Sequence, residues 1–381
     1  MITGREPQLT TTHTHGLQRL SPRRLGTLLN LLNPDAISLD AAAAMLRNNN
    51  FYTRYNAARL LAQRGDRAAR LVMAEALDAD EVPTRAVVAR QLHRFSWYSA
   101  EGLLRQALAD ADERVREAAV YALCDLRQLH AYQLLEETLA GEVDVVLKAA
   151  AWSLRAAPDP AAIPVLAQTI RAADPEVRIQ ALEALAASQQ SDAMPIIRAA
   201  LDDADPDVAY NAALSLVELD GMGELAEHVL QHADTGCEPA LRGLFHASNY
   251  LHIDLANHPA LDALLAALDA ALNSPDTATR SAAIWPLAGL RHPESAALLT
   301  SAFEAEPDAE VQVHMLRVTT SLMRDDVFKA LAERAPDSPH AVVRSLAVAL
   351  HVAHQRGDMA AYDPAATAAA PLQRAELIRN A

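Results

Sequence analysis

Two histidines with a helical spacing come nearest to a metal-binding motif in this chain of 381 residues. His228 and His232 are four residues apart, so a helix would place both side chains on one face. Asp234 and Cys237 follow closely, but zinc requires three or four ligands that converge on one point, and no further ligand has a fixed spacing here. We therefore expect ordinary histidines at a helix surface, and we predict no metal and no other cofactor.

Motifs for catalysis are absent from the sequence. It has no glycine-rich phosphate loop, no Gly-x-Ser-x-Gly elbow and no Cys-x-x-Cys pair. The many carboxylates are spread along predicted turns, where capping of helix ends explains them better than a paired catalytic dyad does. We predict that the protein is not an enzyme.

The composition favours helices and a soluble, cytoplasmic protein. Ala and Leu supply most of the apolar side chains, aromatic residues are 4% of the chain, and no alternating strand pattern occurs. The two cysteines form no paired motif, which is typical of a reducing compartment, and no apolar run is long enough to cross a membrane. The net charge of −16 makes nucleic acid an unfavourable partner, because phosphate would be repelled.

An internal repeat organises the chain. A Val or Thr is followed eight residues later by Leu, and this frame recurs every 31 residues. A seventh frame begins at Pro239, and three more begin at Thr279, Val311 and Val343, after an insertion that we place near residues 246–262. The six regular frames are Thr53 with Leu61, Thr84 with Leu92, Val115 with Leu123, Val146 with Leu154, Val177 with Leu185, and Val208 with Leu216.

Each repeat is predicted to form two helices, A and B. In the third repeat we expect helix A near residues 100–109 and helix B near 115–126, with an acidic turn between them. The turns Asp174-Pro175, Asp205-Pro206, Ser274-Pro275 and Glu306-Pro307 precede a helix B. Asp or Ser at such a turn can cap the free N–H groups of the first helical turn, and Pro fits there without losing a hydrogen bond.

The pattern of an acidic turn, Val-Arg, two small residues and Leu resembles the HEAT repeat, and the period resembles its short bacterial variety, first named for the phycobilin lyases. This resemblance implies an all-α, right-handed α-α superhelix of about ten helical pairs over residues 36–357. It leaves a polar N-terminal tail and first capping helix at 1–35 and a cap or tail at 358–381. It also implies that helix B lines the concave surface. The Arg after the first frame residue is present as Arg54, Arg85, Arg116, Arg178, Arg280 and Arg344.

Counting along helix B from the first frame residue, positions 0, +1, +4, +5 and +8 lie on one face. Small residues dominate position +4, where they permit close packing of helices, and Leu dominates position +8. We expect this face to be buried. We expect the Arg at position +1 to lie at its edge, with its stem packed and its head bridging to an acid in the next turn.

Position +6 points almost opposite to this buried face, toward the predicted concave surface. Aromatic residues and Arg, which dominate binding hot spots, recur in this column. We predict that it binds a protein or peptide partner, although the rings could instead pack across to the next helix B. The predicted partner-binding residues are Arg59, Arg90, Tyr121, Trp152, Glu183, Leu214, Phe245, Trp285 and Arg317.

The favoured function is therefore a scaffold or adaptor of unknown oligomeric state. Two alternatives come from the resemblance. One is an accessory factor or lyase of the phycobilin-lyase type, with Trp152 and Tyr121 near a bound tetrapyrrole. The other is a HEAT-like protein that repairs DNA, supported by Arg59, Arg90 and Arg155 but opposed by the acidic net charge.

Overall fold

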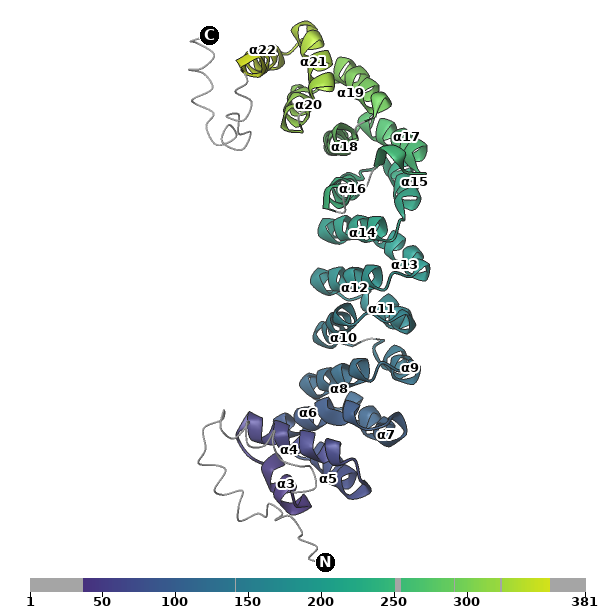
Figure 1. Ribbon diagram of the computed structural model, residues 1–381, viewed down its shortest axis with the longest axis vertical. Helices are drawn as coiled ribbons and strands as arrows, with labels where there is room; N and C mark the ends of the chain where they lie inside the picture. Colours follow the sequence, from purple (N-terminus) through teal and green to yellow (C-terminus); the bar gives the residue numbers. More distant parts are fainter. Residues whose placement is uncertain (1–36, 141, 251–254, 291, 323, 357–381) are drawn as a thin grey trace, which may run out of the picture. The chain divides into compact units, whose positions relative to one another are not determined.

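The chain is built from α-helices that succeed one another in sequence (Figure 1). The computed structural model describes residues 37–140, 142–250, 255–290, 292–322 and 324–356. Over these ranges it contains twenty α-helices, α3 to α22, joined by short turns and 3-10 segments, and no β-sheet. None of the helices in the described part combines the length and apolar character needed to cross a membrane. The all-α prediction is confirmed.

The helices form two compact units, Met1–Ala193 and Met194–Ala381, and each holds five pairs of helix A and helix B. The pairs of the first unit are α3 (Leu39–Leu46) with α4 (Phe51–Arg64), α5 (Arg67–Leu77) with α6 (Val82–Gln91), α7 (Trp97–Leu108) with α8 (Glu113–Leu126), α9 (Leu129–Thr138) with α10 (Asp144–Ala156), and α11 (Ile163–Thr169) with α12 (Pro175–Ala187).

The second unit repeats this arrangement. Its pairs are α13 (Met194–Ala199) with α14 (Pro206–Glu218), α15 (Met222–His232) with α16 (Glu238–Tyr250), α17 (Leu261–Leu272) with α18 (Thr277–Gly289), α19 (Pro293–Ala305) with α20 (Ala309–Ser321), and α21 (Asp325–Arg334) with α22 (Ala341–Arg356). The ten predicted frames begin in, or directly before, the ten B helices. The predicted tails lie outside the described residues, as do residues 251–254 of the predicted insertion.

Within each unit the helices lie in two layers, with even-numbered B helices in one and odd-numbered A helices in the other (Figure 1). Each B helix packs on the next, from α4 to α12 in the first unit and from α14 to α22 in the second. The A helices pack in the same way, for example α5 on α7 and α15 on α17. A single repeat is too small to bury a core alone. Every repeat is therefore stabilised mainly by the neighbours on which it stacks.

Small residues at position +4 allow neighbouring B helices to approach closely. Every member of this column is buried, including Ala119 and Ala150 at 0% exposure. The closest approach is at Gly243 of α16, where a Cβ atom would lie 2.6 Å from Ala213 Cβ and 2.7 Å from the Tyr210 carbonyl oxygen of α14. The Leu residues at position +8 fill the space between the layers and are buried, whereas His351 in the last B helix is exposed.

Asp side chains cap five of the B helices, α8, α12, α14, α18 and α20, but the predicted cap Ser274 was wrong. Asp174 and Asp205 accept hydrogen bonds from the first backbone N–H groups of α12 and α14, as predicted. In α18 and α20 the caps are Asp276 and Asp308, not Ser274 and Glu306. Ser274 and Glu306 lie two residues earlier, where each side chain accepts a hydrogen bond from the backbone N–H of the cap residue.

The Arg at position +1 links one turn to the next. Arg85 donates through Nη1 to the carbonyl oxygen of Ala79 at 2.9 Å, in the turn before its own helix. Its Nε and Nη2 groups meet both carboxylate oxygens of Asp110, in the next turn, at 2.7 and 2.9 Å. Arg280 pairs in the same way with Glu306, and Arg116 meets both carboxylate oxygens of Glu142 through Nε alone. The predicted bridge is confirmed at these three positions.

The remaining members of this column vary. Arg344 donates to the carbonyl oxygen of Ser338 in its own turn. The buried Nε of Arg54 has no hydrogen-bond partner among the described residues. Gln312 occupies this position in place of Arg and makes two neutral hydrogen bonds. Its amide nitrogen donates to the Phe303 carbonyl oxygen at 2.8 Å, and its amide oxygen accepts from the Ser338 hydroxyl at 2.7 Å. The link between consecutive turns is therefore kept at Gln312 without a charge, whereas Leu147, Ala209 and Ala240 are apolar members of the same column.

Gly243→Ala should destabilise the second unit by about 1–3 kcal/mol, because the added methyl group overlaps Ala213 and the backbone of α14. Gly102→Ala is the matched control, because nothing lies within 4 Å of its Cβ position on α7. That change should stabilise the chain by roughly 0.5–1 kcal/mol through helix propensity. Urea unfolding followed by circular dichroism measures both, and an equal effect of the two changes would contradict the close packing.

Asp110→Ala should lower the free energy of unfolding at pH 7 by about 1–3 kcal/mol, because it leaves Arg85 without its carboxylate. The hydrogen bond from Arg85 holds the folded pKa of Asp110 below its ordinary value. The contribution is therefore present above the unfolded pKa of about 3.9 and is lost as pH falls through the lower folded pKa.

Urea unfolding of wild-type and variant chains at several pH values tests this difference. The control is Glu101→Ala, which breaks an exposed pair with Arg105 and should cost at most about 0.5 kcal/mol. Equal losses for the two variants at pH 7 would contradict a structural role for the Arg85–Asp110 pair.

Candidate functional site

The column at position +6 lies on the side of each B helix opposite the buried face. We call its members the B face: Arg59, Arg90, Tyr121, Trp152 and Glu183 in the first unit, and Leu214, Phe245, Trp285, Arg317 and Ala349 in the second. None of these side chains is buried. Trp152 and Ala349 are exposed, and the others are half-buried. The B face of each unit is therefore a surface that a partner can reach.

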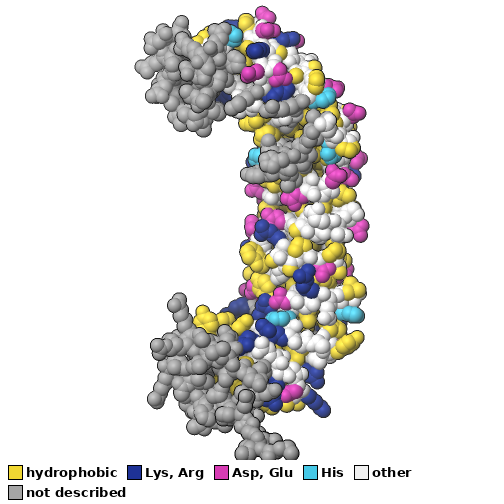
Figure 2. Space-filling model, in the orientation of Figure 1, with side chains coloured by type: hydrophobic (Ala, Val, Ile, Leu, Met, Phe, Trp, Pro, Cys, Tyr) yellow, Lys and Arg dark blue, Asp and Glu magenta, His cyan; other side chains and the backbone are white. Residues whose placement is uncertain are grey.

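Trp152 stands out on the B face of the first unit because 54% of its surface is exposed. On the preceding B helix, Tyr121 lies beneath the guanidinium group of Arg90, whose carbon is 5.5 Å from the ring centre. Arg90 also pairs with Asp125 at 2.7 Å. Figure 2 shows Lys and Arg side chains gathered around α6 and α8, among hydrophobic ones. The surroundings of Trp152 thus combine apolar rings with ordered charges.

A second ion pair lies on the other side of Trp152. Arg155, one turn further along α10, donates to Glu183 of α12 at 2.8 Å. Burial raises the pKa of the Tyr121 hydroxyl, a group that can donate and accept hydrogen bonds at neutral pH. Polar and charged side chains of both neighbouring B helices therefore surround Trp152.

The B face of the second unit is different, because its rings contact one another. Phe245 of α16 and Trp285 of α18 have ring centres 5.0 Å apart, and Trp285 in turn meets His314 of α20 at 5.9 Å. Burial and then the charge of Arg317 lower the pKa of His314, which favours its neutral ring. These rings pack across successive B helices, as one of the two interpretations of the column expected.

A Tyr–His pair extends this row of rings. The Tyr210 hydroxyl of α14 lies 2.6 Å from Nδ1 of His246 on α16, and Arg242 lies over the Tyr210 ring at 5.5 Å. Sequence reasoning on position +6 missed Tyr210, His246 and His314. Tyr210 is at position +2 and His314 is at position +3. Both positions share a helix face with +6, so a search over a wider stripe of the B helix would have included them.

The remaining predicted members of the B face are Arg59, Leu214 and Arg317. Arg59 donates to the side chain of Gln63 at 2.9 Å, and burial lowers its pKa. Leu214 is half-buried. The Nε atom of Arg317 is buried and has no hydrogen-bond partner within the described ranges.

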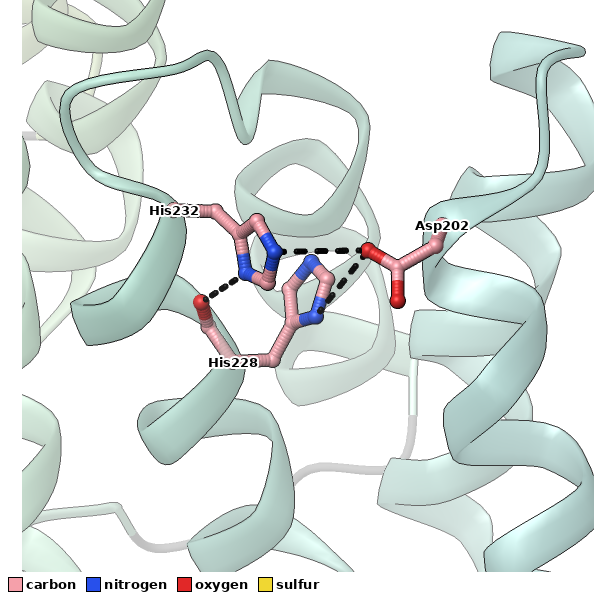
Figure 3. Close-up of side chains that lie close together, drawn as sticks. All are labelled: Asp202, His228 and His232. Atoms are coloured by element: carbon pink, nitrogen blue, oxygen red, sulfur yellow. Dashed lines mark hydrogen bonds and ion pairs between the residues drawn. The ribbon is translucent and has the colours of Figure 1, made fainter.

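The two predicted histidines come together with an acid that sequence reasoning did not single out. His228 and His232 of α15 stack with ring centres 4.3 Å apart, and Asp202, at the end of the 3-10 segment Ala200–Asp202, faces both (Figure 3). His228 is buried, not at the surface as expected, and burial followed by the charge of His232 lowers its pKa. Asp234 and Cys237 are not part of this cluster.

Trp285→Ala should cost about 1–3 kcal/mol of stability, because it removes the ring that packs between Phe245 and His314. Trp152→Ala should change stability by at most about 0.5 kcal/mol, because that ring is largely exposed. Urea unfolding followed by circular dichroism compares the two variants. A large loss for Trp152→Ala would show that this ring is part of the core.

Comparisons with known proteins agree with the geometry. The family model of HEAT repeats matches residues 72–155, 157–246 and 261–350. No curated protein matches the chain. Among solved structures, Kap121p bound to Ste12p has a TM-score of 0.56 at 14% identity, over 86% of this chain and 42% of Kap121p.

Two more structures show the range of similarity. The karyopherin Kap121p bound to the extreme C-terminus of the protein phosphatase Cdc14p has a TM-score of 0.55 at 14% identity, over 86% of this chain and 43% of that one. The X-ray structure of E. coli YibA has a TM-score of 0.41 at 16% identity, over 70% of this chain and 99% of that one. The chain therefore spans about two fifths of the karyopherin. Because the family model covers most of the sequence and each of its matches coincides with stacked helical pairs, the chain belongs to the HEAT-repeat proteins.

Proposed function

We propose that this HEAT-repeat chain is a non-enzymatic scaffold or adaptor that binds a protein or peptide partner on the B face. The family supports this proposal, because stacked helical repeats present long surfaces for binding other proteins. The karyopherin Kap121p, which shares the fold, is described as bound to Ste12p and to the extreme C-terminus of Cdc14p. That similarity concerns the fold alone, so the argument depends on this chain's own residues.

The exposure of Trp152 is the observation that carries the proposal. A Trp side chain with 54% of its surface in water has a large apolar area available for contact. Hot spots of protein interfaces are enriched in Trp, Tyr and Arg, and they are surrounded by contacts that exclude water. The pairs Arg90–Asp125 and Arg155–Glu183, together with the half-buried Tyr121, supply such a border.

A protein partner fits this surface better than nucleic acid does. Arg90 and Arg155, which could have contacted phosphate, are paired with carboxylates, and the chain carries a net charge of −16. Binding to DNA depends strongly on free positive charge at the surface. Nothing on the B face singles out a tetrapyrrole over a peptide. Both cysteines are buried free thiols, which supports our proposal of a cytoplasmic location.

Trp152→Ala should remove the partner without unfolding the chain. The wild-type chain and the variant are each used to capture partners from the native source, and a captured protein is then purified and titrated. We expect Kd to rise by roughly thirtyfold, which corresponds to a hot-spot contribution of about 2 kcal/mol.

The matched control is Tyr98→Ala, because Tyr98 lies on the A helix α7 and is 91% exposed. It removes an exposed ring from the other layer and should leave Kd unchanged. Equal binding by wild-type and Trp152→Ala chains, or equal loss for both variants, would contradict binding through the B face.

A further inference from the structure

The A layer of the second unit holds a cluster of three metal-ligand side chains that is separate from the B face. His228 and His232 are one helical turn apart on α15, and Asp202 reaches them from the end of the preceding repeat's A helix (Figure 3). One nitrogen of each ring and one oxygen of the carboxylate all lie within 4.8 Å of one another. Three possible ligand atoms from two repeats thus lie close together.

A hydrogen bond orients His232 for metal binding. Its Nδ1 lies 3.0 Å from the backbone carbonyl oxygen of His228. Because a carbonyl oxygen only accepts hydrogen bonds, this ring nitrogen carries a proton and donates it. In the neutral ring the lone pair is then on Nε2, which faces Asp202 Oδ1 at 3.5 Å. Metal-bound histidines are commonly held by such a second hydrogen bond.

A positive ion at this cluster would face three possible ligand atoms. Nε2 of His232 lies 3.5 Å from Asp202 Oδ1, and Nδ1 of His228 lies 3.9 Å from the same oxygen. Arg198 is the cation on the neighbouring A helix, but its Nη2 pairs with Glu227 at 3.0 Å. A metal ion between the three side chains could take one ligand atom from each of them.

The three ligand atoms, which all lie within 4.8 Å of one another, are more widely spaced than those of a tetrahedral site. Zinc binds histidine nitrogen at about 2.0–2.1 Å and carboxylate oxygen at about 2.0–2.2 Å, so tetrahedral ligand atoms are roughly 3.3 Å apart. The two histidine nitrogens are 3.5 and 3.9 Å from the Asp202 oxygen. The Asp202 side chain is 62% exposed, so it can shift by the small amount required and leave a fourth position open to water.

We propose that Asp202, His228 and His232 bind a zinc ion. Two imidazole nitrogens and one carboxylate oxygen are a donor set that zinc prefers, whereas calcium and magnesium prefer oxygen ligands alone. The ion would join two consecutive repeats on the A side and would leave the B face free. The site therefore stands or fails independently of partner binding.

Titration of the untagged, chelator-treated full-length chain with Zn²⁺ tests the site, with Co²⁺ as a spectroscopic probe. We expect wild-type chain to bind Zn²⁺ saturably, to melt at a higher temperature with the ion, and to give visible Co²⁺ bands of a four-coordinate site. His232→Gln and Asp202→Asn should each weaken Zn²⁺ binding by more than about tenfold and abolish these bands.

Both variants change exposed or half-exposed side chains, so circular dichroism should show them folded. His130→Gln is the matched control, because it removes an exposed histidine on α9, outside the cluster. Unchanged Zn²⁺ affinity in the two cluster variants, an equal loss in the control, or the absence of saturable binding by wild-type chain would overturn the proposal.

Discussion

Close packing of neighbouring B helices is the constraint on which the rest of each unit depends. It favours a small residue at position +4, where the chain has Ala or Gly in eight of the ten repeats and Val88 and Met315 in the other two. At Gly243 even a methyl group would overlap the preceding helix. Because the two backbones approach on this face, the rotation of each B helix about its own axis is fixed. The opposite side of the helix, at position +6, is then the side left open to solvent or to a partner.

The turns between helices add a second, more polar set of links. An Arg at position +1 holds its own turn through backbone carbonyl groups and reaches an acid in the next turn, as Arg280 does with Glu306. That acid in turn accepts the backbone N–H of the next cap residue, Asp308. A partly buried pair of this kind stabilises one specific spacing between repeats. Where Gln312 replaces Arg, two neutral hydrogen bonds keep the link.

Much of this architecture could be predicted from the sequence, because the stacking is local. The Val-to-Leu frame recurs with nearly constant spacing, and each frame begins a B helix. The predicted cap of α18 was wrong because Ser274, like Glu306 before α20, occupies the position five residues before the frame, where a side chain supports the cap instead of forming it. A proline follows Asp174 and Ser274 alike, so it did not distinguish a cap from the residue that supports it.

The candidate sites were less predictable, because they depend on contacts between repeats. Trp152 and Trp285 share position +6, yet one is exposed and the other packs against Phe245 of the neighbouring B helix. The previous repeat has an aromatic ring at position +6 in both cases, Tyr121 and Phe245, so the residue type alone does not predict which tryptophan packs. Asp202 joins His228 and His232 from 26 positions earlier in the chain, since 228 − 202 = 26, and no short motif indicates that pairing.

The orientation of the B helices can be measured directly by hydroxyl-radical footprinting of the folded chain with mass spectrometry. Met315 at position +4 is 0% exposed, whereas Trp152 at position +6 is 54% exposed, and both side chains react readily with radicals when water reaches them. We expect rapid oxidation of Trp152 and protection of Met315 until the chain is unfolded. Oxidation of Met315 as fast as that of Trp152 in the folded chain would contradict the packing and the open face together.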